Sequence, residues 1–77
     1  MNNSRRKELT KISETLHLLE EGISNLQMEE EESFDNLPEG IQESERGQQM
    51  EENAYELDEI ANEMEELRER IDEIINK

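Results

Sequence analysis

The sequence predicts an all-helical protein, an antiparallel helical hairpin in which a structured loop connects two long helices. In two separate segments, apolar residues recur every three or four positions, as on one face of an α-helix, and no segment shows the alternation of a strand. Between these segments lie the only Pro and two of the three Gly, the residues that most often interrupt helices. We expect a single helical domain over 1-77, with a first helix at about 4-33, a loop at about 34-44 and a second helix at about 45-76.

The first helix is predicted from an apolar stripe with alternating spacings of three and four residues. Its members are Leu9, Ile12, Leu16, Leu19, Ile23 and Leu26. An unbroken heptad pattern of this kind is typical of the seam between two packed helices. Ser4 is the expected N-cap, because its hydroxyl can accept a hydrogen bond from the free amides of the first turn. Leu18 and Met28 lie outside this stripe.

The segment from Ser33 to Gly47 is longer than a connection between two helices needs to be. Pro38 disfavours a helical conformation at the residue before it, so the first helix should end between Glu32 and Asn36. Asn36 is expected to cap a short helical turn, with Glu39 three residues further on. The apolar residues of this loop either fold back over the end of the bundle or are held for a partner; they are Phe34, Leu37 and Ile41.

The second helix, with Ser44 as its expected N-cap, carries a wider apolar face. Its central stripe consists of Met50, Ala54, Leu57, Ala61 and Met64, and a flanking row of Ile60, Leu67 and Ile74 runs beside it. Alanine allows a neighbouring helix to approach closely. One narrow seam buries little surface, so we expect a homo-oligomer, a coiled-coil-like four-helix bundle or larger. The residues expected at its interface are Leu57, Ile60, Ala61, Met64, Leu67, Ile71 and Ile74.

The net charge of -15 is distributed unevenly along the chain. Acids and bases balance in residues 1-28 and again in 67-77, so the whole excess lies between Glu29 and Glu66, where Arg46 is the only base. A hairpin brings both balanced segments to the end that holds the termini. We therefore expect a rod with an acidic head, the end that contains the loop, and a balanced tail.

Composition argues against most chemical functions. There is no Cys, and His17 is the only imidazole, so neither a thiolate metal site nor nucleophilic catalysis is indicated, and we expect no enzymatic activity and no cofactor. Residues 35 to 46 have the length of an EF-hand loop, but Leu37 and Arg46 stand where oxygen ligands are required. A strongly acidic chain repels phosphates, which argues against direct nucleic-acid binding. No apolar run is long enough for a membrane span or a signal peptide, so we expect the mature protein to be the whole chain.

The loop and the start of the second helix resemble a segment of short acidic proteins from Gram-positive phages and prophages. The resemblance covers about twenty residues: the run Phe34-Asp35-Asn36-Leu37-Pro38-Glu39, then Gln42, Ser44-Glu45-Arg46-Gly47 and Met50-Glu51-Glu52. It implies a phage or prophage origin and a host bacterial cytosol, and it implies no particular activity.

Three functional hypotheses follow from the charges. The acidic head is the candidate partner-binding surface, formed by Glu52, Glu56, Glu59, Glu63, Glu66, Asp35 and Glu39. It is either a solvated helix face or a DNA-mimicking surface that inhibits a host nucleic-acid-handling or defence protein. In the second hypothesis a phosphorylated small molecule or nucleotide signal binds at the basic end, with Arg5, Arg6 and Lys7 as the anion site. The third is a helical assembly or adaptor protein.

Overall fold

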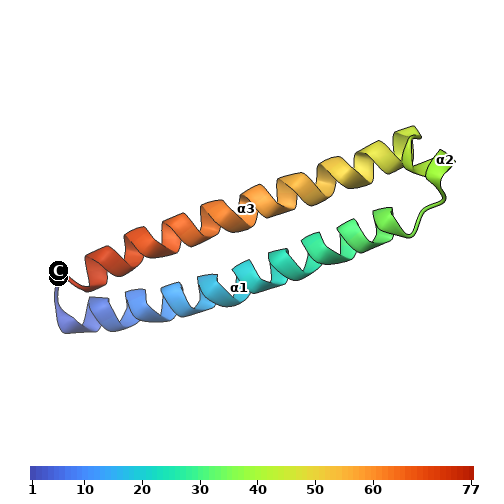
Figure 1. Ribbon diagram of the computed structural model, residues 1–77. Coiled ribbons are helices and arrows are strands. Elements are labelled where there is room, and N and C mark those ends of the chain that lie inside the picture. Colours follow the sequence, from blue (N-terminus) through green and yellow to red (C-terminus); the bar gives the residue numbers. More distant parts are fainter.

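Two long antiparallel helices form nearly the whole protein, and a third, very short helix lies at their connection (Figure 1). The structure is a computed structural model that describes all residues from 1 to 77. Helix α1 spans Asn3–Asp35, α2 spans Glu39–Gln42 and α3 spans Glu45–Ile75. Because α1 and α3 pack against each other along their length, the predicted all-helical hairpin is confirmed.

Helix α1 begins earlier than its expected cap. The side-chain oxygen of Asn2 accepts a hydrogen bond from the backbone amide of Arg5 at 2.8 Å, so Asn2 is the N-cap. Ser4 lies inside the first turn, and its prediction as N-cap was wrong. Asparagine is at least as good a cap as serine, and the cap at Asn2 adds residues to the helix.

The chain reverses direction at Pro38. Helix α1 ends at Asp35, and the amide of Asn36 still donates to the carbonyl of Glu32 at 3.0 Å. Pro38 is the N-cap of the next helical turn, and its carbonyl accepts hydrogen bonds from the amides of Ile41 and Gln42. Asn36 therefore terminates α1 and does not cap α2, so that part of the loop prediction was wrong. Proline fixes its own φ near helical values, which favours a start at this position.

Helix α2 packs tightly against the start of α3. Ser44 caps α3, as the sequence indicates, by accepting a hydrogen bond from the amide of Gly47 at 3.4 Å. Gly47 is buried, and a Cβ added there would lie 2.6 Å from the carbonyl oxygen of Ile41. The side chain of Gln42 donates to the carbonyl of Phe34 at 3.1 Å, which ties α2 to the end of α1. Glycine is needed at position 47 for this close approach, and not to break the helix.

The seam between the helices uses the predicted face of α3. All five residues of its central stripe are buried or half-buried: Met50, Ala54, Leu57, Ala61 and Met64. Ala54 and Ala61 are the only buried apolar residues, each with 7% of its surface exposed. The small side chains at these positions let α1 approach closely.

On α1 only half of the predicted stripe faces α3. Leu9, Leu16 and Ile23 are half-buried, whereas Ile12, Leu19 and Leu26 are more than half exposed. The alternate seam positions are instead occupied by the polar residues Ser13, Glu20 and Gln27, which are buried or half-buried. The seam is rotated toward this polar side because Ser13 and Glu20 hydrogen-bond to partners on α3.

The resulting molecule is a thin rod that measures 58 × 14 × 13 Å between its outermost Cα atoms. Its radius of gyration of 17.4 Å exceeds the roughly 12 Å of a compact chain of this length. No large side chain is fully buried. The two termini lie together at one end, where a guanidinium nitrogen of Arg6 donates to the backbone carbonyl of Lys77 at 3.1 Å.

Candidate functional site

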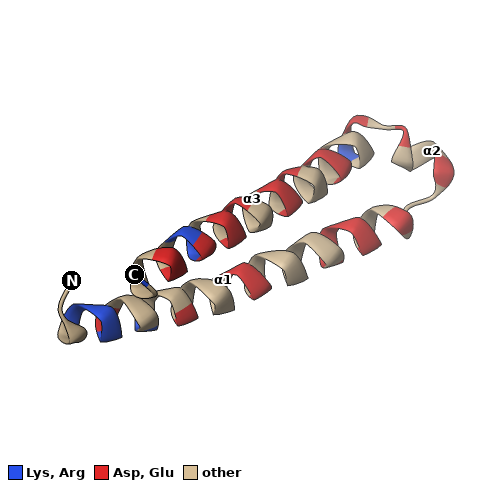
Figure 2. Cartoon of the chain, turned by 60° about the vertical axis from the view of Figure 1, so that its left-hand side comes forward, with Lys and Arg blue, Asp and Glu red and all other residues tan.

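The outward surface of α3 carries the acidic residues that the sequence singles out. All five carboxylates of the predicted stripe are exposed: Glu52, Glu56, Glu59, Glu63 and Glu66. A second exposed row, Glu51, Asp58 and Glu65, runs along the polar edge of the seam. These eight residues are called the acidic face below. Figure 2 shows acidic residues along both helices toward the connection, and basic residues mostly near the termini.

Charges are dense along the acidic face. Eight carboxylates between residues 51 and 66 occupy about 23 Å of helix, or one charge in about 3 Å. The phosphates of one DNA strand are spaced about 3.4 Å apart along the helix axis. The acidic face therefore has a linear charge density like that of a single nucleic-acid strand.

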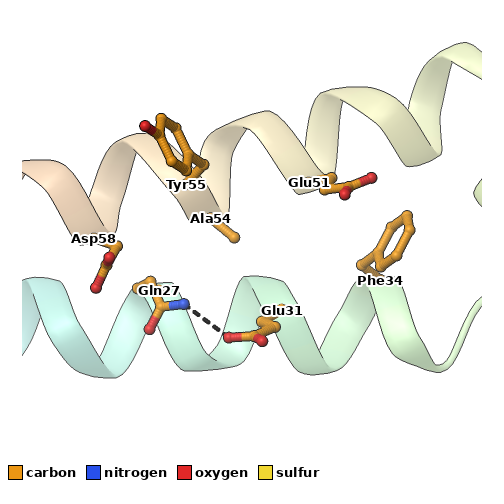
Figure 3. Close-up of a pocket in the computed structure, with 7 residues that line it drawn as sticks. All are labelled: Gln27, Glu31, Phe34, Glu51, Ala54, Tyr55 and Asp58. Atoms are coloured by element: carbon orange, nitrogen blue, oxygen red, sulfur yellow. Dashed lines mark hydrogen bonds between the residues drawn. The ribbon is translucent and has the colours of Figure 1, made fainter.

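A shallow pocket interrupts the acidic face where α1 and α3 meet near the head (Figure 3). It has a volume of about 360 Å³, and its lining residues are Gln27, Glu31, Phe34, Glu51, Ala54, Tyr55 and Asp58. Gln27 donates a side-chain hydrogen bond to Glu31 at 2.8 Å, so one carboxylate is held in place within α1. Three carboxylates and two aromatic rings line a space that fits the end of a Lys or Arg side chain.

Tyr55 lines this pocket and lies close to carboxylates of the acidic face. Tyr55 is 65% exposed. The pKa of Tyr55 is raised above its ordinary value, first by a hydrogen bond and by charge repulsion from Glu59, and then by slight desolvation and repulsion from Asp58. Ionisation is opposed because a tyrosinate would add another negative charge beside these carboxylates.

The head itself is partly packed. Asp35 and Glu39, the two loop residues expected in the acidic head, are both exposed. Phe34 and Leu37 are half-buried at the end of the hairpin, whereas Ile41 remains 44% exposed. Phe34 belongs to the last turn of α1 and lies between the two long helices beside Glu51 (Figure 3), so it contributes to the seam.

Sequence reasoning missed the polar contacts that fix the register of the two helices. Ser13 donates a hydrogen bond to Asp72 at 2.7 Å, and Arg68 donates to Glu20 at 3.3 Å. Glu20 also lies 3.9 Å from His17. Position 68 lies seven residues after Ala61, so the heptad period that placed the alanines in the seam could have placed Arg68 there as well.

At the opposite end, the basic residues are only partly brought together. A hollow of about 520 Å³ is lined by Asn3, Arg6, Lys7, Thr10, Lys11 and Glu14. Arg5 does not line it, and Arg6 already donates to Asn3 and to the carbonyl of Lys77. The candidate anion site therefore holds two of its three predicted residues, together with an acid.

The predicted oligomer interface divides into two groups. Ala61 is buried, and Leu57, Met64 and Ile71 are half-buried in the seam with α1. The flanking row of Ile60, Leu67 and Ile74 is left 42 to 48% exposed. Only this second group is available for contact with another molecule.

No three or more His, Asp or Glu side chains converge in a way that could hold a metal ion. Neither long helix contains a stretch with the length and apolar character needed to cross a lipid bilayer.

Comparison of the chain with protein-family models, with curated proteins and with solved structures found no match.

Proposed function

We propose that this protein is a non-enzymatic binding protein that inhibits a host nucleic-acid-handling or defence protein by presenting its acidic face to that protein's basic groove. The observation that carries the proposal is the acidic face, eight exposed carboxylates in two rows over residues 51 to 66. A groove that accepts a DNA strand is lined with Lys and Arg at spacings that suit closely placed negative charges. Long-range attraction between such surfaces also speeds their association.

Two structural features support this proposal. The carboxylates are attached to one continuous helix, α3, so they are fixed relative to each other before binding. The pocket beside Tyr55 adds a site where a Lys or Arg side chain can lie against an aromatic ring between carboxylates. An ordinary solvated helix face does not need a pocket that can bind a cation.

The resemblance of the loop segment to short acidic phage proteins supports a phage or prophage origin. We accordingly place the protein in the cytosol of a bacterial host, where proteins that handle DNA or defend against phages have basic grooves. The two other hypotheses remain as competing outcomes. Binding of a phosphorylated small molecule would depend on the basic end, and an assembly or adaptor role would need neither the acidic face nor the basic end.

A capture experiment with a DNA competitor tests the proposal. The tagged protein is used to capture proteins from a host lysate, and duplex DNA or added salt is then used to release them. We expect both to release the target, because many charge pairs form at once and DNA occupies the same groove. Reversal of Glu52, Glu59 and Glu66 to Lys should lower the retained target about tenfold or more.

The matched control reverses three acids in the other half of the rod, namely Glu8, Glu14 and Glu69 to Lys. This variant changes the net charge by the same amount and should retain the target. If both variants lost the target equally, the net charge alone would explain the binding, and the position of the acids would not matter. A target that resists DNA and salt, or that is lost on changing Arg5, Arg6 and Lys7 to Ala, would overturn the proposal.

A further inference from the structure

Six large apolar side chains form two exposed rows, one on each long helix. The row on α1 is Ile12, Leu19 and Leu26, and the row on α3 is Ile60, Leu67 and Ile74. Their exposed fractions range from 42 to 57%. Within each row the residues are seven positions apart, so each row follows one line along its helix.

Both rows lie on the same side of the hairpin. Each residue of a row comes directly before a residue of the seam, and those seam residues are themselves seven positions apart. For example, Leu19 precedes Glu20 and Leu67 precedes Arg68. In an antiparallel helix pair these positions flank the seam on one side and face each other across it. The opposite side is polar, because it carries Glu31 and Asp58 at the edge of the pocket.

The two rows are also in register along the rod. The hydrogen bond between Arg68 and Glu20 sets the relative height of the helices, so Leu19 and Leu67 lie at about the same level. Ile12 is then level with Ile74, and Leu26 is level with Ile60. The rows form three apolar layers about 10.5 Å apart, and we call this surface the apolar face. A hollow of about 290 Å³ between Ile12, Leu16 and Leu19 opens onto it.

The rod has excess surface that a protein interface could cover. The isolated hairpin exposes 6067 Å², whereas a compact folded chain of 9.1 kDa exposes about 4,900 Å². One long side of the rod, 58 by 14 Å, covers about 800 Å². A standard protein–protein interface buries about 800 Å² on each partner. Contact over the part of this side that surrounds the three apolar layers would therefore remove a substantial share of the excess surface.

We propose that a second copy of this chain covers the apolar face head to tail, giving a four-helix bundle in which the loop of each copy points away from that of the other. The two-fold axis is perpendicular to the rod and passes through the layer of Leu19 and Leu67. In this arrangement α1 packs against α1 of the second copy, and α3 packs against its α3. Both helix pairs are antiparallel.

The charges beside the apolar face on α3 select this orientation. Glu56, Glu63, Arg70 and Lys77 are seven residues apart and form one row beside Leu67 and its neighbours. A two-fold axis at Leu67 places Glu63 level with Arg70 of the second copy, and Glu56 level with its Lys77. The row is thus self-complementary, with two acids followed by two bases, and its symmetric contacts give four pairs of opposite charge.

The alternative bundle, with both loops at the same end, is disfavoured by the same charges. It would place α3 against α1 of the second copy, with Glu56 level with Glu29 and the two acidic heads side by side, so that the one attractive pair, Lys77 with Glu8, is offset. The head-to-tail bundle brings only Glu8 and Glu29 together as a like-charged pair. It leaves most of the acidic face free, including Glu52 and Glu59, so this inference does not depend on the proposed function.

A charge-exchange cycle tests the interface. Arg70→Glu and Glu63→Arg should each weaken the dimer about tenfold, because each creates two symmetric like-charge contacts. The double variant E63R/R70E should restore wild-type affinity, and Glu66→Arg, on the outer face of α3, should leave it unchanged. Sedimentation equilibrium measures the dissociation constants. A wild-type monomer at every concentration, or a double variant no tighter than the single ones, would overturn the proposal.

A distance measurement tests the orientation independently. The chain has no Cys, so a spin label attached at Glu43→Cys, an exposed loop position, reports one distance per dimer. In the head-to-tail bundle the two labels should be about 70 Å apart, because their loops lie at opposite ends. Pulsed EPR would measure a much shorter distance if the loops shared one end, which would overturn the proposed orientation.

Discussion

Replacing Gly47 with Ala should destabilise the protein, although Ala is the better helix former. An added Cβ would lie 2.6 Å from the carbonyl oxygen of Ile41 and would also overlap the carbonyl of Gln42. Both are backbone atoms, so rotation of a side chain cannot relieve the overlap. Helix α2 would have to move away from α3, which would strain the hydrogen bond that ties Gln42 to Phe34.

The expected magnitude follows from two opposing contributions. Helix propensity favours Ala by about 1 kcal/mol, whereas overpacking of a tight contact typically costs about 1 to 3 kcal/mol. Because the overlapping atoms belong to the backbone, we place the cost at the upper end and expect a net loss of about 1 to 2 kcal/mol. For a domain of this size the melting temperature should then fall by about 4 to 16 °C.

Gly22→Ala is the matched control. Gly22 lies within α1, and no atom lies within 4 Å of a Cβ added there, so the substitution should raise stability by about 0.5 to 1 kcal/mol. Thermal melting followed by circular dichroism at one fixed protein concentration compares the two variants. If Gly47→Ala raised the melting temperature as Gly22→Ala does, the close packing of α2 on α3 would be refuted.

Two further predictions concern charged groups in and beside the seam. Arg68→Met should lower stability by about 1 kcal/mol because it leaves the largely buried carboxylate of Glu20 unpaired, and the double variant E20L/R68M should recover this loss and exceed the wild type. Urea unfolding measures the free energy of unfolding of both variants, and a double variant less stable than R68M would contradict the reasoning. In an alkaline titration followed by ultraviolet absorbance, Tyr55 should ionise with a pKa above 10, and Glu59→Gln should move the midpoint back toward 10. Since the folded pKa is raised, the contribution of Tyr55 to stability should be present below pH 10 and lost as pH rises through the folded pKa; a midpoint at or below 10 would contradict this.

The sequence alone determined the fold class and the location of the charges. The spacing of apolar residues predicted two long helices, because burial of one helix face requires a period near 3.6 residues. Pro38 predicted the reversal between them, because proline restricts the backbone of the residue before it. Once the chain folds into a hairpin, the acidic excess between Glu29 and Glu66 must lie toward the loop. These conclusions depend only on local chemistry and on the order of residues along the chain.

Only the tertiary structure decided which side of each apolar stripe faces the partner helix. Periodicity gives an angular position on one helix, but a stripe as wide as that of α1 can meet a partner at more than one angle. The close approach allowed by Ala54 and Ala61 and the hydrogen bonds from Arg68 to Glu20 and from Ser13 to Asp72 select one angle. That rotation leaves the rows that contain Leu19 and Leu67 uncovered. The sequence could not predict the rotation, because the spacing of apolar residues within either segment does not encode contacts between residues far apart in the chain.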